Sequence, residues 1–299
     1  MKTRNFLLLT LFIGLLLAGG SIAVAPLVVI WSSKGDPDRF ASPVSIALDA
    51  QGSLYVADSH NNRIQKLDSN GHLMTKWGSL GKGNGQFDCR DYNFCAVSVD
   101  GNGNVYVIDG NNNRVQKFDA NGKFLTKWGS RGYENGQFIN PFGLGVDRAG
   151  NVYVADENNH IQKFDTNGKF LARLGGPGSG DGEFGGVIRI AFDSQGNIYV
   201  SDMGNGLQKF DAGGKFLVKY KTCGKDILNG ALGLALDAQD NVYVFGPANK
   251  QICKFDSSGQ FLTIWDGFDN PAEGMAIDQQ GNIYLTEGAV NLVVKFHQP

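Results

Sequence analysis

The chain has 299 residues, of which 42 are glycine and 8 are proline, so glycine is about twice as frequent as in an average globular protein. Collagen would need glycine at every third position, and a disordered chain would not contain 42% hydrophobic and 11% aromatic residues. The 27 Lys and Arg residues nearly balance the 29 Asp and Glu residues, and the resulting net charge of -2 argues against nucleic acid as a partner. The composition therefore predicts a folded protein that is rich in turns.

The N-terminus has the pattern of an export segment. Lys2 and Arg4 precede an uncharged, leucine-rich run over residues 6–25. Two interpretations stay open, because Ala23-Val24-Ala25 has the small residues of a cleavage site, whereas the run is also long enough to span a bilayer as an anchor. We therefore divide the chain into a signal peptide or membrane anchor, residues 1–25, and an extracytoplasmic domain, residues 26–299, that is either secreted or tethered to the membrane through residues 6–25.

One pattern recurs six times after this segment. The copies begin at Leu54, Val105, Val152, Ile198, Val242 and Ile283, with spacings of 51, 47, 46, 44 and 41 residues. Each copy contains four short runs of strand-forming residues, separated by turns such as Asp119-Ala120-Asn121-Gly122. Four strands that repeat every 40 to 50 residues or so are typical of a propeller blade. We predict an all-β, six-bladed β-propeller over residues 26–299.

The sequence also predicts how the ring closes. The last copy stops after its third strand, whereas Leu27 to Trp31 aligns with the outer-strand segment Phe124 to Trp128. We therefore expect residues 27–31 to supply the missing fourth strand of the last blade, which would leave no long sheet edge open.

The pattern D-x-x-G-N-Y-V-x-D followed by N-x-R-I-Q-K-F, as in the copies that begin at Leu54 and Val105, resembles the NHL-repeat family of six-bladed β-propellers. The arginine of that pattern, Arg63 and Arg114, is replaced by His160 and Gly206 in the next two copies, which puts in doubt any function that needs it in every blade. His60 and His160 lie in loops of the first and third copies, an arrangement similar to that of peptidylglycine amidating lyases, NHL-like propellers that hold zinc with histidines from alternate blades.

Four cysteines fit an oxidising compartment. Cys89 and Cys95 flank a short insertion, and a local disulfide between them is the natural interpretation. Cys223 and Cys253 are expected on the same face of the propeller, either as a second disulfide or as two buried thiols.

The innermost strands contain one pair of charged residues that the repetition does not explain. Arg189 stands where the other copies have a small residue, and Glu273 interrupts an apolar series one position earlier. Both are expected near the mouth of the central channel, where propellers bind small ligands. They are our candidates for ligand contacts, together with His60 and His160; the alternative is a private salt bridge or a solvated channel lining.

Other repeated charges have structural explanations. Acids that end the second strands (Asp58, Asp109, Asp156, Asp202 and Glu287) would form a calcium-binding ring only if they faced the channel, and we expect each to cap its own loop. The lysines of the third strands, such as Lys66 and Lys117, are predicted to lie on solvated blade edges.

We conclude that the sequence predicts an exported, monomeric binding or scaffold domain for a protein or small extracellular ligand, with no resident cofactor and no catalytic residue. The alternative is an extracytoplasmic metal-dependent lyase or hydrolase of the amidating-lyase type, with zinc or calcium near His60, His160, Arg189 and Glu273. Two histidines alone do not complete a zinc site.

Overall fold

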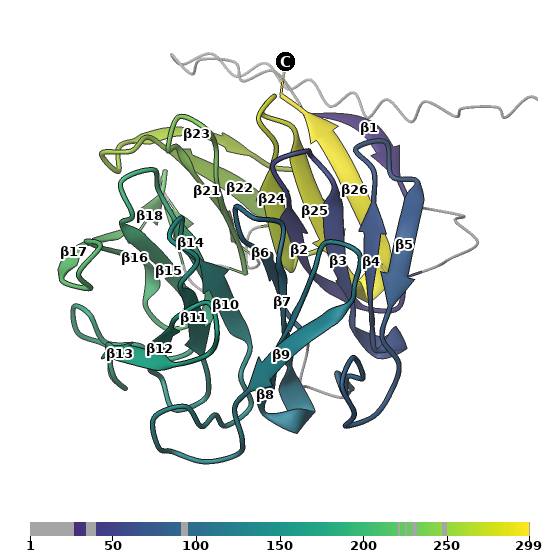
Figure 1. Cartoon of the computed structure of the whole chain (residues 1–299). Coiled ribbons are helices and arrows are strands. Elements are labelled where there is room, and N and C mark those ends of the chain that lie inside the picture. The colour runs from purple at the N-terminus through teal and green to yellow at the C-terminus, as the bar shows by residue number, and fades with distance from the viewer. Residues whose placement is uncertain are drawn as a thin grey trace, which may run out of the picture.

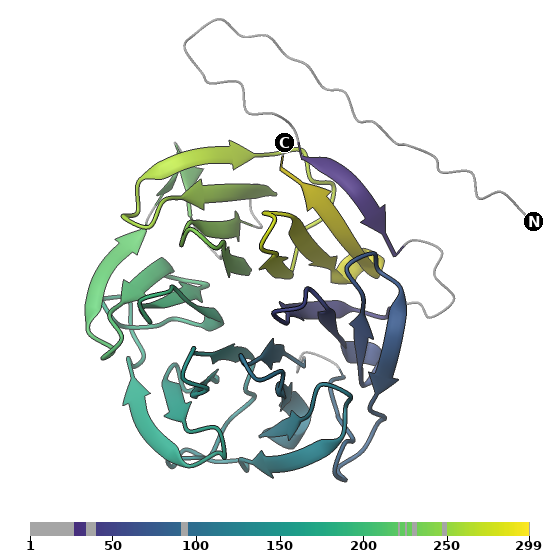
Figure 2. The ribbon, with the colours of Figure 1, turned by 45° about the horizontal axis from the view of Figure 1, so that its top comes forward.

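The computed structural model describes residues 27–33, 40–90, 95–220, 222–224, 226–228, 232–246 and 250–298. The predicted signal peptide or anchor lies outside these residues. In the described part of the chain, no helix has the length and apolar character needed to cross a membrane. Six four-stranded antiparallel sheets are arranged as blades around a central axis, as Figures 1 and 2 show.

The blades follow the six sequence copies in order. From the innermost strand outward, blade 1 contains β2 (Pro43–Leu48), β3 (Leu54–Asp58), β4 (Arg63–Leu67) and β5 (Leu73–Trp77); blade 2 contains β6 (Val97–Val99), β7 (Val105–Asp109), β8 (Arg114–Phe118) and β9 (Phe124–Trp128); blade 3 contains β10 (Gly143–Val146), β11 (Val152–Ala155), β12 (Ile161–Phe164) and β13 (Phe170–Leu174). Blade 4 contains β14 (Val187–Phe192), β15 (Ile198–Asp202), β16 (Gly206–Phe210) and β17 (Phe216–Tyr220), and blade 5 contains β20 (Gly233–Leu236), β21 (Val242–Gly246), β22 (Gln251–Phe255) and β23 (Phe261–Trp265). A two-stranded ribbon, β18 (Thr222–Cys223) and β19 (Asp226–Ile227), lies between blades 4 and 5 in the chain.

Blade 6 is built from both ends of the described chain. Its strands are β24 (Gly274–Ile277), β25 (Ile283–Glu287), β26 (Leu292–His297) and, outermost, β1 (Val28–Ser32). In the antiparallel register, Val28 lies opposite His297 and Trp31 lies opposite Lys295. Figure 2 shows the purple β1 alongside the yellow β26 at the rim of the ring. The predicted closure by an N-terminal strand is confirmed.

The turns have the chemistry that the sequence predicts. In the turn between β10 and β11, the Asp147 carboxylate accepts hydrogen bonds from the backbone N–H groups of Ala149 and Asn151, at 3.0 and 2.8 Å. Gly150 in the same turn has a φ of 85°, a conformation that glycine adopts without steric cost. The same arrangement recurs from blade to blade, which explains a large share of the glycines.

The core lies between the blades. Tyr55 of blade 1 and Val105 and Phe118 of blade 2 are completely buried in one shared hydrophobic cluster. At the rim, the indole ring of Trp77 covers Gly122 in the hairpin of the next blade so closely that a Cβ there would lie 2.5 Å from the ring. The blades are therefore joined by side-chain packing, because each four-stranded sheet pairs its strands only within itself.

The third-strand lysines are buried or half-buried, and the prediction that they lie on solvated blade edges was wrong. Lys66 is only 9% exposed; its Nζ lies 4.8 Å from the centre of the Tyr55 ring and 3.6 Å from the carboxylate of Asp49. The same lysine-over-tyrosine contact is present in every blade, between Lys66 and Tyr55, Lys117 and Tyr106, Lys163 and Tyr153, Lys209 and Tyr199, Lys254 and Tyr243, and Lys295 and Tyr284. A cation above an aromatic face contributes about 0.5 to 2 kcal/mol. These lysines brace the sheets internally.

Candidate functional site

One face of the propeller collects the loops between second and third strands and the connections between blades. The acids that end the second strands face these loops and are bound there. Asp58 accepts hydrogen bonds from the Ala41 N–H and the Arg63 Nε, both at 2.6 Å, and is completely buried. Asp109 binds the Asp88 N–H and the Arg114 Nε in the same way, both at 2.7 Å. These two carboxylates fasten blades 1 and 2 to the preceding connections, a contact that the capping prediction did not include, and they also accept hydrogen bonds from Asn61 and Asn112 of their own loops.

Arg189 crosses the axis of the ring. It belongs to β14 of blade 4, and its Nη2 donates hydrogen bonds to the carbonyl of Val44 in blade 1, at 2.7 Å, and to the carbonyl of Glu273 in blade 6, at 2.6 Å. Its Nη1 donates to the neighbouring Ile188 carbonyl at 2.9 Å. Burial lowers the pKa of the guanidinium to about 10, while the nearby Glu273 raises it, so the group stays charged at neutral pH. Arg189 thus joins opposite sides of the ring.

The carboxylate of Glu273 lies beside this bridge. The backbone N–H of Glu273 donates to the Thr286 carbonyl at 2.9 Å. The Glu273 side chain packs against Gly288, where a Cβ would lie 2.7 Å from Oε1 of Glu273. Burial raises the pKa of Glu273 above its ordinary range, and the charges of Arg189 and His60 partly offset the rise. His60 itself is exposed. We call Arg189, Glu273 and His60 the channel-mouth cluster.

His160 does not belong to this cluster. The backbone shows why: a residue with positive φ ends each loop, Asn62 in blade 1 and Asn159 in blade 3. His60 lies two residues before that position, whereas His160 follows it directly, in the place that Arg63 occupies in blade 1. His160 instead lines a separate cavity with Tyr133 and Arg173. The sequence alignment of the repeats already places His160 at the position of Arg63 and not at that of His60, so the two histidines could have been distinguished on that basis.

The geometry therefore does not support the two-histidine zinc hypothesis. Within the described ranges, the structure places no three or more His, Cys, Asp or Glu side chains where they could hold one metal ion. The channel-mouth cluster offers one imidazole and one carboxylate beside a fixed guanidinium, an arrangement suited to binding a polar ligand group.

The cysteines form two disulfides on the loop-bearing face. Cys89 is joined to Cys95 with a Cα–Cα distance of 5.2 Å, and Cys223 of β18 is joined to Cys253 of β22 with a distance of 5.8 Å. The Cys89 N–H donates to the Asn62 side chain at 2.9 Å, which ties the first bridge to blade 1. The predicted Cys89–Cys95 pair is confirmed, and of the two alternatives left open for Cys223 and Cys253 the structure shows the disulfide. The two bridges indicate an oxidising, extracytoplasmic location.

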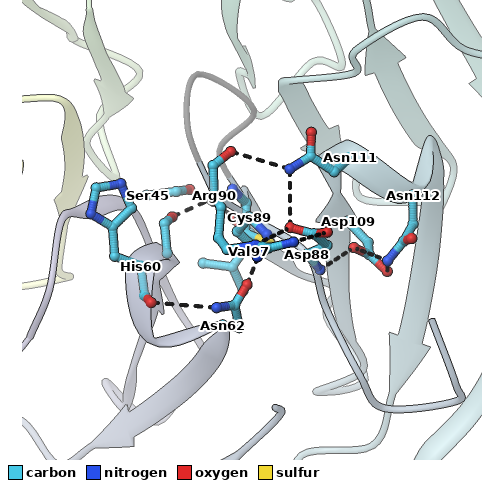
Figure 3. The surroundings of a disulfide bond; sticks show 12 residues. Ser45, His60, Asn62, Asp88, Cys89, Arg90, Val97, Asp109, Asn111 and Asn112 are labelled. Carbon is cyan, nitrogen blue, oxygen red and sulfur yellow. Dashed lines mark hydrogen bonds and ion pairs between the residues drawn. A yellow bond between two sulfur atoms is a disulfide. The ribbon is translucent and has the colours of Figure 1, made fainter. Parts of the chain in front are cut away.

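Figure 3 shows the charged surroundings of the first bridge. The Asp88 carboxylate accepts two hydrogen bonds from the Arg90 guanidinium, at 3.0 and 2.9 Å, and one from the Asn111 side-chain amide, at 3.0 Å. The hydrogen bond from Arg90 is the main reason why the pKa of Asp88 falls to about 2. This network fixes the residue that precedes Cys89.

Six four-stranded blades around a common axis, closed by a strand from the other end of the chain, define a six-bladed β-propeller. The NHL-repeat family model matches residues 40–67 and 96–118, and a model described as a 6-bladed beta-propeller matches residues 148–256. The chain belongs to the NHL-repeat family of six-bladed β-propellers.

The curated relatives that the chain matches are longer proteins. The human NHL repeat-containing protein 3 is 30% identical over 105 residues, which are 34% of this chain and 29% of that protein. The protein brain tumor of Drosophila melanogaster is 28% identical over 119 residues, or 40% of this chain and 11% of that protein. Among solved structures, a streptogramin B lyase superposes with a TM-score of 0.62 at 13% identity and covers 88% of this chain and 95% of its own. That likeness establishes the fold alone.

Proposed function

We propose that the protein is an exported, non-catalytic binding or scaffold domain whose ligand, a protein or a small extracellular molecule, docks at the channel-mouth cluster. The observation that carries the proposal is the fixed position of Arg189, whose bonds to Val44 and Glu273 form the floor of the mouth. The Glu273 carboxylate and the exposed His60 stand beside this floor, and both can bind polar ligand groups.

The location is part of the proposal. The disulfides indicate an oxidising compartment, and a segment with the features of a signal peptide or anchor precedes the domain in the sequence. We propose that the domain acts as a monomer outside the cytoplasm, either secreted or held at the membrane through residues 6–25, and that nucleic acid is not its partner.

The second candidate is a metal-dependent lyase or hydrolase. A streptogramin B lyase has the same fold, but at 13% identity this says nothing about the residues of its site. Elemental analysis of the purified protein separates the two functions. Zinc or calcium at one ion per chain would favour the enzyme, and protein without bound metal that still captures its partner would favour binding.

The binding proposal is tested by capture of partners from native envelope or culture medium with the full chain as bait. We expect the paired changes Glu273→Gln and His60→Ala to abolish capture of the partner. His72→Ala is the matched control, because His72 is exposed in the hairpin between β4 and β5, on the opposite face. Equal capture by the paired variant and the wild type would refute docking at the channel mouth.

A further inference from the structure

Blade 3 contains a cavity at a position that cationic side chains fill in the two neighbouring blades. The cavity has a volume of about 240 Å³ and is lined by Tyr133, Asp156, Asn158, His160, Gln162 and Arg173. It lies where the connection from blade 2 crosses the loop between β11 and β12. Its volume is below the roughly 300 to 1,000 Å³ of pockets for drug-sized ligands and suits a single side chain.

Blade 2 shows the filled form of this cavity. Arg114 reaches beneath the connection from blade 1, where its Nε donates to Asp109 at 2.7 Å and its Nη1 donates to the Lys82 carbonyl at 2.8 Å. Its Nη2 donates to the carbonyls of Gly83 and Gln86, at 2.8 and 2.9 Å. One carboxylate and three carbonyl groups thus surround a guanidinium whose side chain is only 8% exposed.

Blade 4 fills the corresponding position by another route. Gly206 stands there in place of the arginine, and Lys219 reaches in from the outer strand β17. Its Nζ donates to the carbonyls of Ser179 and Gly180, at 3.1 and 3.2 Å. The carbonyl groups of the connection therefore bind a cation in both neighbours of blade 3.

Blade 3 keeps the same acceptors. Asp156 corresponds to Asp109, and it is 1% exposed. Within the described ranges, its carboxylate accepts hydrogen bonds from neutral donors, namely the Ile139 N–H at 2.8 Å and the backbone and side-chain N–H groups of Asn158, at 3.1 and 2.9 Å. Burial raises the pKa of Asp156, and the charge of the nearby His160 partly offsets the rise. No ion pair of the kind that Arg114 makes with Asp109 is present at this carboxylate in the part of the chain that the structure describes.

The cations near the cavity do not occupy its interior. His160 stands in the place of Arg114, but its Nε2 lies toward the next connection, 3.9 Å from where a Cβ on Gly176 would be. Arg173 reaches in from the outer strand like Lys219, yet its guanidinium is exposed and, among the residues that the structure describes, bonds to the carbonyl of Tyr133 alone, at 3.1 Å. The carbonyls of Glu134 and Gln137, which correspond to those of Gly83 and Gln86, each keep a lone pair for a further donor.

We propose that the blade 3 cavity is a binding site for a guanidinium group supplied by a ligand, either an arginine side chain of a peptide or a small guanidino compound. The ligand places its cation between the Asp156 carboxylate and the carbonyls of Glu134 and Gln137, as Arg114 does in blade 2. A planar guanidinium matches several fixed oxygen acceptors better than a compact ammonium does. This inference deepens the proposed binding function, because it assigns a ligand chemistry to a second position on the same face.

The test is a titration of the full chain, followed by NMR, with methylguanidine and with the blocked peptide acetyl-Gly-Arg-Gly-amide. We expect saturable binding of both at millimolar concentrations, and at least tenfold weaker binding of the same peptide with neutral citrulline in place of arginine. Tighter binding of the peptide identifies a peptide ligand, and equal binding identifies a small guanidino compound. Failure of both probes to saturate the protein, or equal binding of the citrulline peptide, overturns the proposal.

Two reciprocal variants make the test specific to the cavity. His160→Arg supplies an internal guanidinium, as in blades 1 and 2, and should abolish binding of methylguanidine in a protein that still folds. Arg114→His should open the matching cavity in blade 2 and raise the stoichiometry from one to two. Unchanged methylguanidine binding by His160→Arg would overturn the proposal. It would leave docking at the channel mouth intact, because that docking is tested at Glu273 and His60, which do not line this cavity.

Discussion

Replacement of Arg189 by methionine tests whether this side chain supports the ring as well as the channel mouth. The guanidinium makes three hydrogen bonds to backbone carbonyls, two of which join blade 4 to blades 1 and 6 across the axis. Methionine fills most of the same volume but donates nothing, so the carbonyls of Val44 and Glu273 would have to bind water in the channel.

The expected loss follows from two opposing contributions. Hydrogen bonds from a charged donor contribute about 2 kcal/mol each, so three bonds contribute about 6 kcal/mol. Burial lowers the pKa of Arg189 to about 10, so the desolvation of the charged guanidinium offsets roughly half of this gain, about 3 kcal/mol. We therefore expect Arg189→Met to lower the free energy of unfolding by about 3 kcal/mol.

The assay is equilibrium unfolding in urea with the full chain. Arg189→Lys should lower the free energy of unfolding by about half as much, because the ammonium group of the shorter lysine cannot donate to carbonyls of three blades at once. Arg148→Met is the matched control, since Arg148 is exposed in the turn between β10 and β11. A loss below about 0.5 kcal/mol for Arg189→Met would refute the bridging role, because surface substitutions already fall in that range.

Three further predictions concern the periphery of the ring. Deletion of residues 26–33 should lower the melting temperature far more than trimming an ordinary terminus does, because it removes the strand paired with β26; an unchanged melting curve would contradict closure by β1. Replacing the Cys223–Cys253 pair by serines should cost about 3.6 kcal/mol in urea unfolding, against about 2.2 kcal/mol for Cys89–Cys95, because loop-closure entropy grows with the separations of 30 and 6 residues; the reverse order would argue against that account. Arg90→Gln should raise the pKa of Asp88 from about 2 toward its ordinary 3.8. The wild type loses stability as the pH falls from about 4 to about 2 and Asp88 becomes protonated, and the variant should lose less over the same range. An NMR titration in which the pKa of Asp88 stays near 2 would refute the role of Arg90.

The fold could be predicted because its determinants are local and repeated. Each Asp-x-x-Gly turn fixes a hairpin with its own carboxylate, as at Asp147 and Gly150, and six repetitions leave little choice of architecture. The closing strand was predictable because Trp31 aligns with the outer-strand tryptophans. The burial of the lysines could not be predicted, because the sequence around Lys66 does not show that Tyr55 and Asp49 of the same blade lie next to its ammonium group.

The candidate site was only partly predictable, because its geometry depends on side chains from different blades. The sequence singles out Arg189 and Glu273 as exceptions to the repeat, and the structure brings them together through the bond from Arg189 to the Glu273 carbonyl. It does not show that Arg189 binds the backbone of the opposite blade, an interaction between residues 145 positions apart. The cavity at His160 was not predicted, because it exists where blade 3 lacks an arginine corresponding to Arg114 of blade 2. Its carbonyl acceptors belong to the backbone of a connection, and many different sequences can supply them.

From the pairing of β1 with β26 we also expect a particular order of folding. Val28 and His297 are separated by 269 residues, whereas the other strand pairs of the blades join neighbours in the chain. Because long-range contacts form slowly, we expect the blades to assemble first and the ring to close last. Until then, β26 presents an unpaired edge to which the β1 strand of another molecule can bind. High protein concentration during refolding is therefore expected to favour strand-exchanged dimers.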